Sequence, residues 1–423
     1  MNRNKRACLF IFCLVILVLS FGQQAFAGGA YLSEVATPAS LGTVGVGNVV
    51  NNIGADSAWA NPAGMTGLDK DTVLGGLQVV IPNIRWDSDI ATAGGKDGGN
   101  AGNFAAIPGL FAVKTLGDKW RIGFGASAPF GGGLDYGDDF VGRYQAQKSI
   151  IAGLGLSPSV AYKINDQFSV GAGVSVTYTK YDLEVAIKQP GFGDGQVTLD
   201  GIDDWSYQGF AGLTWQVTER AMIGAVYRSK NDIELEGDID FDGIVIPILN
   251  ELTSRFDEAE VDFDFPEVYR IGLKYQATDR LVVMVDADLE TWSDFSETGI
   301  EISTSGPVTK VAELDRNYKD TWHVGAALAY KIDSSSGFAT GVSYDSSPVD
   351  DNDRTADLPL DEQLKFGMAY VKEGKGKLGY GIGFSLMWFG DGKMDQVAQG
   401  ELFKGEFESN YVIFAGGSAR YEF

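Results

Sequence analysis

Alternating apolar and polar residues dominate the chain from about residue 72 to its C-terminus. From Leu378 to Trp388 the even-numbered positions are large and apolar, whereas the odd-numbered positions are mostly glycine. The same period of two recurs in residues 168–179, 281–290 and 411–423. This period predicts β-strands, because successive side chains of a strand point to opposite faces.

The predicted strands are too long for an ordinary soluble sandwich, whose strands have about five or six residues. Many run past about ten residues, the length that a tilted membrane strand needs. One face is apolar with aromatic residues near its ends, and the other is small, polar or charged. This pattern predicts an outer-membrane barrel, which must close because lipid cannot satisfy an open sheet edge.

Short turns such as Gly117-Asp118 and Thr278-Asp279 alternate with long polar connections such as 87–102 and 238–258. Alternating connection lengths and a C-terminal aromatic residue, here Phe423, are typical of bacterial barrels with periplasmic short turns. We therefore predict an all-β fold, a 14-stranded antiparallel transmembrane β-barrel over residues 72–423. The expected strands are 72–86, 103–116, 119–130, 149–164, 167–188, 204–217, 220–236, 259–277, 280–302, 317–332, 337–346, 361–373, 377–392 and 407–423.

The first residues predict export. Basic Arg3, Lys5 and Arg6 precede a short apolar run that ends near Ala25-Phe26-Ala27. Residues 1–27 therefore read as a cleaved secretory signal peptide rather than a membrane anchor. Both cysteines of the chain precede residue 28, so we expect no disulfide and no cysteine chemistry in the mature protein.

Residues 28–71 do not alternate and precede the first strand. A barrel of fourteen strands is wide enough to need filling unless it is an open pore. We predict that this segment is an N-terminal plug inside the lumen, because Leu41, Val44 and Trp59 need burial. The alternative is a loose periplasmic tail.

Charge and composition exclude several functions. The chain carries 57 acidic and 33 basic residues, a formal net charge of −24, which makes nucleic acid an unsuitable partner. His323 is the only histidine, and the sequence has no G-x-S-x-G and no HExxH motif. We therefore expect no catalytic residue, no metal site and no cofactor, and interpret His323 as a residue of the lumen lining.

The predicted plug contains Asn61-Pro62-Ala63-Gly64 within Asp56–Met65, and Ala128–Gly133 ends the expected third strand. With Gly142-Arg143-Tyr144 and Pro158–Tyr162, these segments resemble the FadL family of outer-membrane transporters over essentially the whole mature chain. The resemblance implies a fourteen-stranded barrel with an N-terminal hatch. It also implies capture of long-chain fatty acids or other hydrophobic compounds outside, and their sideways exit through the wall.

Asn61, Pro62, Ala63 and Gly64 are the candidate hatch and gating residues, since Asn-Pro forms a fixed bend. A static structural turn is the alternative. Pro129, Phe130, Gly131 and Gly132 are the candidate lateral opening. Proline removes a ladder hydrogen bond, so the wall is expected to break there, unless the strand merely ends.

The long connection 238–258 predicts a short amphipathic helix that starts near Pro247. Its apolar face holds the candidate residues for hydrophobic ligand capture, Ile244, Ile248, Leu249, Leu252 and Phe256. This face needs a partner, either a neighbouring loop or a ligand.

On the expected strand 259–277, parity points Val261, Phe263, Phe265, Tyr269, Ile271 and Leu273 outward. Glu260, Asp262, Asp264, Arg270 and Lys274 then point inward, and Glu267 is an outward exception beside Pro266. Arg228, Arg270 and Lys365 are candidate partners for a ligand carboxylate. The alternative is that they pair with acidic residues of the lumen.

The sequence thus predicts passive outer-membrane transport of hydrophobic small molecules, with long-chain fatty acids first and aromatic hydrocarbons as the alternative. A general polar porin and a lipase-type outer-membrane enzyme are alternatives from other classes. We expect a monomer, surrounded by outer-membrane lipid and lipopolysaccharide.

Overall fold

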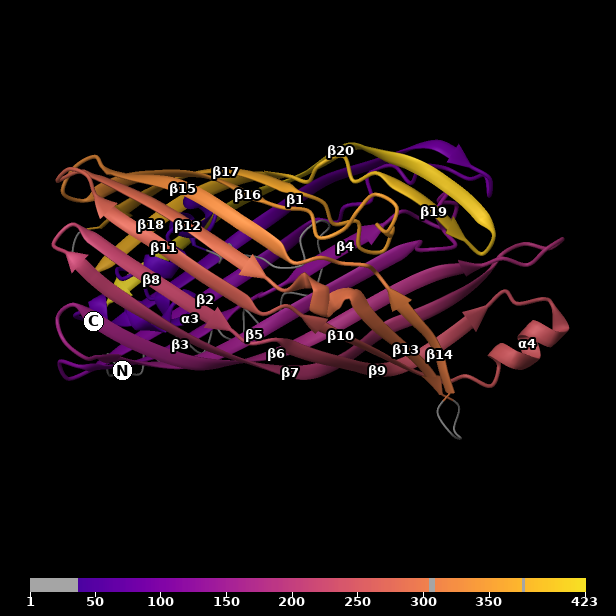
Figure 1. The fold of residues 1–423 in the computed structure, drawn as a ribbon, viewed down its shortest axis with the longest axis horizontal. Helices are drawn as coiled ribbons and strands as arrows, with labels where there is room; N and C mark the ends of the chain where they lie inside the picture. The colour runs from indigo at the N-terminus through magenta and orange to yellow at the C-terminus, as the bar shows by residue number, and fades with distance from the viewer. Residues whose placement is uncertain (1–36, 304–308, 375–376) are drawn as a thin grey trace, which may run out of the picture.

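The computed structural model describes residues 37–303, 309–374 and 377–423. The expected signal peptide and the first part of the expected plug, residues 28–36, lie outside these described residues. In the described part, twenty strand segments form one sheet, which closes because β1 (Thr72–Ala91) pairs with β20 (Glu401–Glu422). The segments make the predicted fourteen-stranded antiparallel barrel (Figure 1).

Nine of the fourteen barrel strands are continuous within the described residues. Besides β1 and β20 they are β2 (Ala105–Leu116), β5 (Lys148–Lys163), β6 (Phe168–Ile187), β7 (Gly195–Thr218), β16 (Ser336–Asp345), β17 (Gln363–Glu373) and β18 (Leu378–Trp388). A further segment, β19 (Met394–Ala398), forms a hairpin with β20.

The other barrel strands are interrupted, which the alternation pattern did not predict. They consist of the paired segments β3 (Trp120–Ser127) and β4 (Gly131–Asp135), β8 (Ala221–Arg228) and β9 (Asn231–Asp242), β10 (Glu258–Phe265) and β11 (Val268–Gln276), β12 (Leu281–Glu290) and β13 (Glu297–Ser303), and β14 (Thr309–Asp315) and β15 (Thr321–Lys331). Continuous strands over 220–236, 259–277 and 280–302 are therefore wrong, and the expected strand 119–130 already ends at Ser127. Pro129 and Pro266 lie at two of the breaks, and the 3-10 helix η3 (Trp292–Ser296) occupies a third.

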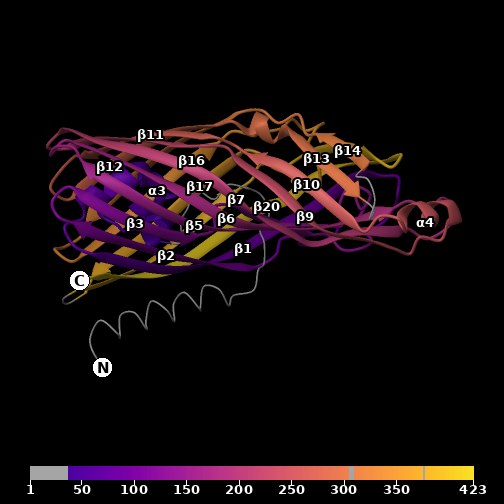
Figure 2. The same cartoon turned by 90° about the horizontal axis from the view of Figure 1, so that it is seen from below.

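The two ends of the barrel differ. The C-terminus lies at the end with the short turns, whereas α4 (Pro247–Thr253), β19 and β13–β14 lie at the opposite end (Figures 1 and 2). In outer-membrane barrels the short turns are periplasmic, so α4 is assigned to the extracellular side. The predicted loop helix is confirmed, and it begins at Pro247.

Exposed aromatic side chains cover the outer surface at two levels. Those nearer the short turns include Trp120, Trp215, Tyr275, Tyr330 and Tyr380, and those nearer the long loops include Trp205, Tyr227, Tyr269 and Trp322. Exposed aliphatic residues such as Ile271 and Val324 lie between them. This is the apolar band with aromatic girdles that a membrane requires. Within the described residues, no helix has the length and apolar character needed to cross a membrane.

Candidate ligand-binding site and hatch

Residues 37–67, called the hatch segment here, form short helical pieces that pack against inward-facing residues of the barrel. The pieces are α2 (Pro38–Thr43), η1 (Asn48–Val50), α3 (Ser57–Ala60) and η2 (Pro62–Gly67). Leu41, Val44 and Trp59 are buried as predicted. Polar bonds also fasten the segment to the wall: the Ser159 hydroxyl donates to the Ala58 carbonyl oxygen at 3.0 Å, and the Gly47 N–H donates to Asp286 Oδ2 at 2.9 Å.

The four candidate hatch residues lie together as an anchor. Asn61 is fully buried, and its Nδ2 donates to the carbonyl oxygens of Val49, at 2.7 Å, and of Leu213 on β7, at 3.1 Å. Its Oδ1 accepts from the Ala63 N–H at 3.1 Å and so caps η2, which starts at Pro62. Gly64 is equally constrained, because a Cβ atom there would collide with the Asn51 carbonyl oxygen. One amide therefore joins both halves of the hatch segment to the wall.

The candidate lateral opening lies where the β2–β3 ladder ends. The last pair of that ladder is Leu110↔Ala126, whereas β4 pairs with β5. The next backbone bridge on the β2 side is Gly102↔Leu134, and in between the Ser127 hydroxyl donates to the Pro108 carbonyl oxygen at 3.4 Å. Between these two points, residues 105–109 of β2 keep their pairing with β1. We call this interval, between 105–109 and 127–133, the wall gap.

Pro129 and Phe130 lie in the wall gap, and Gly131 and Gly132 begin β4. Proline has no N–H to donate, so it suits the interruption. The Phe130 side chain does not point to lipid but is almost fully buried, with only 2% of its surface exposed. Its ring stacks on Phe265 from across the barrel lumen, with centroids 4.1 Å apart.

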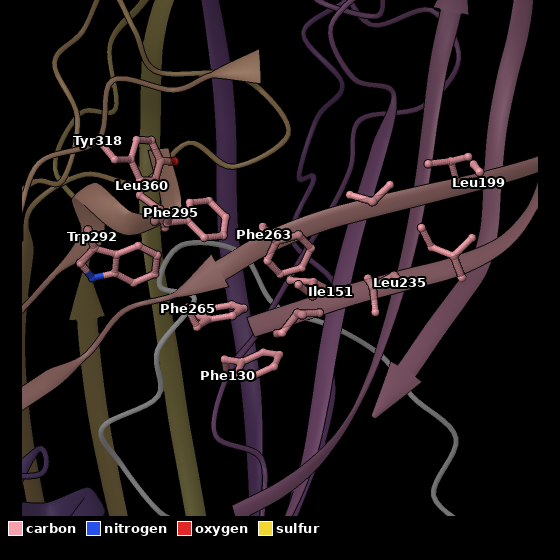
Figure 3. Packing of buried hydrophobic residues seen from close by; sticks show 14 of the residues in the cluster. Phe130, Ile151, Leu199, Leu235, Phe263, Phe265, Trp292, Phe295, Tyr318 and Leu360 are labelled. Carbon is pink, nitrogen blue, oxygen red and sulfur yellow. The ribbon is translucent and has the colours of Figure 1, made fainter. Parts of the chain in front are cut away.

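Phe130 and Phe265 belong to a larger cluster of aromatic rings (Figure 3). We call it the aromatic chamber, and its rings are those of Phe130, Phe263, Phe265, Trp292, Phe295 and Tyr318. The Phe265 ring meets the Trp292 ring edge-on at 6.0 Å, and the Phe295 and Tyr318 rings stack at 5.5 Å. Such arrangements are the favourable geometries for aromatic pairs.

The aromatic chamber exists because side-chain parity reverses at Pro266. In β11, on the C-terminal side of Pro266, the side chains of Tyr269, Ile271 and Leu273 face outward, as predicted. In β10, on the N-terminal side of Pro266, Val261, Phe263 and Phe265 are buried inside the barrel, and Asp262 is exposed on the outside. The predicted outward orientation of these three apolar residues, and the inward orientation of Glu260, Asp262 and Asp264, are therefore wrong. The extra residues at the break shift the alternation by one, as a bulge does.

Glu267 itself is outward, and the structure explains this exception. Its carboxylate accepts hydrogen bonds from the hydroxyls of Tyr227, at 2.9 Å, and Tyr269, at 2.5 Å, on the outer surface. Its N–H donates to the Thr291 hydroxyl at 3.0 Å, which compensates for lost ladder bonds. The break is thus held from both sides.

A cleft adjoins the aromatic chamber. It lies between β4, β5, β10 and the loop that follows β16, and it is partly open to solvent. Gly132, Ile151, Phe263, Phe295, Arg316 and Leu358 line it, among other residues. Most of this lining is apolar, so the cleft suits a hydrophobic ligand.

Arg316 is the cationic residue of this cleft, and it is already paired. Its guanidinium donates to both carboxylate oxygens of Asp357, at 3.2 and 2.7 Å, and to the Thr355 hydroxyl at 3.0 Å. Burial opposes ionisation of Asp357, but the adjacent Arg316 outweighs burial and holds the pKa of Asp357 below its ordinary value. The charge of Arg316 is therefore largely satisfied within the protein.

The predicted carboxylate partners face the lumen, as parity predicted, but each also has a partner there. Arg228 donates to the Trp59 carbonyl oxygen of the hatch segment. Arg270 pairs with Asp288, and Lys365 lies 3.3 Å from Asp345. This is the alternative that the sequence left open, in which lumen cations bind lumen acids. Contact of these residues with a ligand stays a prediction.

The candidate capture residues on and around α4 differ in how much of their side chains is exposed. Ile248 is 79% exposed, whereas Ile244, Leu249 and Phe256 are half-buried. Phe256 packs against the hydrophobic cluster that contains the aromatic chamber, and the Leu252 side chain lies outside the described residues. Part of the apolar face thus packs on the protein, and part remains exposed.

His323, which the sequence assigned to the lumen lining, is buried between carboxylates. The two ring nitrogens of His323 face carboxylates, with Nδ1 2.9 Å from Asp345 and Nε2 3.6 Å from Asp286. Within the described ranges, no three His, Cys, Asp or Glu residues are grouped so as to hold a metal ion.

Sequence reasoning missed Arg316, Asp357 and the pair Trp292 and Phe295. The i, i+3 spacing of this aromatic pair, inside an expected strand, is the signal that could have revealed η3. No comparable signal marks Arg316 and Asp357, because their pairing joins two loops.

Comparison with known proteins agrees with this geometry. Residues 18–423 match the family model of the outer membrane protein transport protein (OMPP1/FadL/TodX). The long-chain fatty acid transport protein of Salmonella typhi is 21% identical over 398 residues, covering 88% of this chain and 90% of that protein. Outer membrane protein P1 of Haemophilus influenzae is 22% identical over 394 residues, covering 80% and 84%.

Two solved structures show the same fold. The Pseudomonas aeruginosa FadL homologue has a TM-score of 0.85 at 21% identity, over 93% of this chain and 100% of that one. The Pseudomonas putida toluene transporter TodX has a TM-score of 0.71 at 19% identity, over 93% and 99%. The chain therefore belongs to the OMPP1/FadL/TodX family of outer membrane transport proteins, whose members are transporters and not enzymes.

Proposed function

We propose that this protein passes small hydrophobic molecules through the aromatic chamber and out through the wall gap. The exposed part of the α4 face, around Ile248, receives the ligand from outside. The ligand then enters the cleft beside Phe263 and Phe295. It leaves sideways between β2 and β4, past Phe130, into the membrane.

The observation that carries this proposal is the position of Phe130. It follows Pro129 in the wall gap, yet its ring stacks on Phe265 inside the aromatic chamber. A single side chain therefore separates the chamber from the gap. A change in the side-chain rotamer of Phe130 would open this boundary without unfolding a strand.

Long-chain fatty acids are the first candidate ligands. The relative from Salmonella typhi is named a long-chain fatty acid transport protein. Affinity for an alkyl chain would come from burial, at about 0.8 kcal/mol per methylene group. The apolar lining of the cleft supports such burial.

Aromatic hydrocarbons are the second candidate, and a specific observation favours them. The chamber is lined by aromatic rings, and Arg316 in the adjoining cleft is neutralised by Asp357. An uncharged ligand would need no cation there, whereas a carboxylate would have to compete with Asp357. TodX, which shares the fold, is named a toluene transporter.

The test is uptake of labelled oleate and labelled toluene, measured in parallel, by cells that lack their own transporters for both. Uptake of oleate supports the first candidate, and uptake of toluene alone supports the second. Phe130→Ala would raise the initial rate if the ring is the boundary. Phe124→Ala is the matched control, because Phe124 lies on β3 with its side chain exposed on the outer surface. No uptake of either compound by the correctly inserted protein would reject the proposal.

The hatch proposal has its own variant. Replacing Asn61, Pro62 and Ala63 by glycine removes the bonds from Asn61 to Val49 and Leu213, so uptake should change with the barrel still inserted. His323→Ala should leave uptake unchanged, whereas a lipase-type enzyme would lose activity. Salt conductance like that of an open pore would identify a polar porin instead. We further propose that the protein works as a monomer within lipid and lipopolysaccharide, since one chain forms the whole route.

A further inference from the structure

The two edges of the wall gap stay in register with each other. Toward the short turns the β2–β3 ladder ends at Leu110↔Ala126, and toward the long loops the pairing resumes at the bridge Gly102↔Leu134. Eight residue steps lead from Gly102 to Leu110 along one edge, and eight lead from Ala126 to Leu134 along the other. The antiparallel register is therefore the same on both sides of the gap, and the pairing is interrupted without being shifted.

The extracellular end of the wall gap is fastened by the connection between β1 and β2. The Asp135 N–H donates to the Ala101 carbonyl oxygen of this connection at 2.9 Å. Farther out, the Lys96 N–H donates to the Asp139 carbonyl oxygen at 2.7 Å, and the Lys96 carbonyl oxygen accepts from the Val141 N–H at 2.9 Å. These main-chain bonds join the two edges beyond the gap.

Arg143 lies at the outer end of this fastening, and each of its three guanidinium nitrogens donates hydrogen bonds. Nη1 and Nη2 donate to the carbonyl oxygens of Gly94, at 2.8 Å, and of Ala93, at 3.2 Å, in the β1–β2 connection. Nε donates to Asp194 Oδ2 at 2.8 Å, in the connection between β6 and β7. One side chain of the β4–β5 connection therefore binds two other extracellular connections, and we call Arg143 with these three partners the rim clasp.

The rim clasp needs an arginine. A guanidinium presents donors in several directions of one plane, whereas the ammonium of a lysine is a single compact charge. Only 13% of the Arg143 side chain is exposed, and the Tyr144 hydroxyl donates to the second oxygen of Asp194 at 2.7 Å. Shielding from water and a second bond to the same carboxylate make this ion pair firmer than a freely exposed surface pair.

We infer that the rim clasp sets the length of the wall gap, so that Arg143 is a specificity-determining residue for the exit. This inference rests on the proposed sideways route. Residues 127–133 have little slack when both ends are held, because each edge spans the same number of residues. The held gap admits an alkyl chain or a single ring and excludes broad fused-ring compounds. Release of the clasp lets the pairing at Gly102↔Leu134 open, which lengthens the gap.

The test is parallel uptake of labelled oleate, labelled toluene and labelled pyrene, a fused polycyclic compound, by cells that lack their own transporters. The unmodified protein should carry oleate or toluene and leave pyrene at the rate of cells without the protein. Arg143→Met should raise pyrene uptake at least five-fold, with uptake of the narrow compound within two-fold. Lys404→Met is the matched control, because Lys404 pairs with Asp395 at 2.8 Å within the β19–β20 hairpin and not across the gap.

The ratio of pyrene uptake to uptake of the narrow compound separates selectivity from loss of folded protein, since poor insertion lowers both rates together. An inserted Arg143→Met protein that carries the narrow compound and still excludes pyrene overturns the inference. Pyrene uptake by the unmodified protein also overturns it. Uptake of neither oleate nor toluene by the unmodified protein rejects the proposed function instead.

A second pair of variants disturbs the fastening without changing Arg143. A Cβ atom on Gly98 would lie 2.8 Å from the Tyr136 carbonyl oxygen, whereas one on Gly99 would have no atom within 4 Å. Both glycines have a positive φ, 76° and 67°, so Gly98→Leu and Gly99→Leu introduce the same kind of backbone strain. Gly98→Leu should push the β1–β2 connection away from the residues after β4 and raise the pyrene ratio at least two-fold over Gly99→Leu. Identical ratios in these two inserted variants overturn the inference.

Discussion

The two proline-marked interruptions of the wall have opposite consequences. At Pro129 the strand leaves β2, and residues 105–109 keep only their β1 partner between the bounds of the wall gap. At Pro266 the halves β10 and β11 both stay paired on two sides, with β9 and β13 and with β8 and β12. A proline removes one hydrogen bond, so it does not by itself open a barrel. Whether the wall opens depends on whether the neighbouring strands stay hydrogen-bonded on both sides of the break.

The first interruption turns one aromatic side chain, Phe130, inward, and the second turns several residues inward. Above Pro266 the reversed parity supplies Phe263 and Phe265 to the aromatic chamber. η3 and the residues between β14 and β15 add Trp292, Phe295, Arg316 and Tyr318 at the same level. In the proposed route, one interruption provides the exit, and the other provides the binding site that faces it.

The largest expected effect comes from Arg316, which holds the loop over the second interruption. Arg316→Met leaves the Asp357 carboxylate buried without its cation and should lower the free energy of unfolding by about 3–5 kcal/mol. The double variant Arg316→Met with Asp357→Leu should recover most of this loss. Urea unfolding of the inserted protein measures both. Equal destabilisation of the single and double variants would show that the loss comes from other contacts of Arg316 and not from an unpaired Asp357 carboxylate.

Truncation in the aromatic chamber should have the next largest effect. Phe265→Ala removes the ring that stacks on Phe130 and meets Trp292, and such truncations cost about 3 kcal/mol or more. We expect weaker ligand binding, by about ten-fold or 1.4 kcal/mol, in a Trp292 fluorescence titration. Ile271→Ala, on the adjoining strand but facing lipid, should bind like the unmodified protein.

Filling the wall gap should act on transport without changing binding. Ala128 packs beside the cluster that contains Ile107, so Ala128→Trp places a large ring in the gap. Uptake should fall about ten-fold, which corresponds to about 1.4 kcal/mol in the barrier, while ligand affinity measured in detergent remains unchanged. Ala112→Trp on β2, away from the gap, controls for bulk. Normal uptake by Ala128→Trp would place the exit elsewhere.

The smallest effects should come from the prolines themselves. Pro266→Ala should change unfolding by less than about 1 kcal/mol, because the Glu267 N–H bond to Thr291 and the outer tyrosine contacts maintain the break. Pro129→Ala adds an N–H to a strand without a β2 partner at that point, and should lower uptake by two-fold or less. A loss of several kcal/mol in either variant would show that proline, and not the surrounding pairing, sets the interruption.

Much of the fold followed from local pattern. The alternation in residues 378–388 and the turn at Gly117-Asp118 suffice to predict a strand and its periplasmic connection, because both depend on neighbours in sequence. The helix beginning at Pro247 and the burial of the segment around Trp59 follow from similar arguments. Counting the alternating short and long connections then predicted the number of barrel strands.

Less of the candidate site could be predicted from the sequence. The Asn61–Gly64 group was identified by its resemblance to known hatches, but its bonds to Val49 and Leu213 join residues far apart in sequence. The sequence predicted that Phe263 faces outward, whereas it faces inward. The prediction was wrong because it extended the alternation through the break at Pro266 as if the strand were continuous. Arg316 and Asp357 carried no local signal at all.

The sequence by itself determined an exported, closed barrel with polar lumen and lipid-facing apolar positions, because lipid imposes a period of two on every uninterrupted strand. Only the tertiary structure decided where the strands break, which neighbouring strands stay paired across each break, and which aromatic rings meet inside the barrel. Those outcomes depend on the register between paired strands. Some of these strands, such as β1 and β20, are hundreds of residues apart in the sequence. Register is a property of pairs of strands, and no single strand contains it.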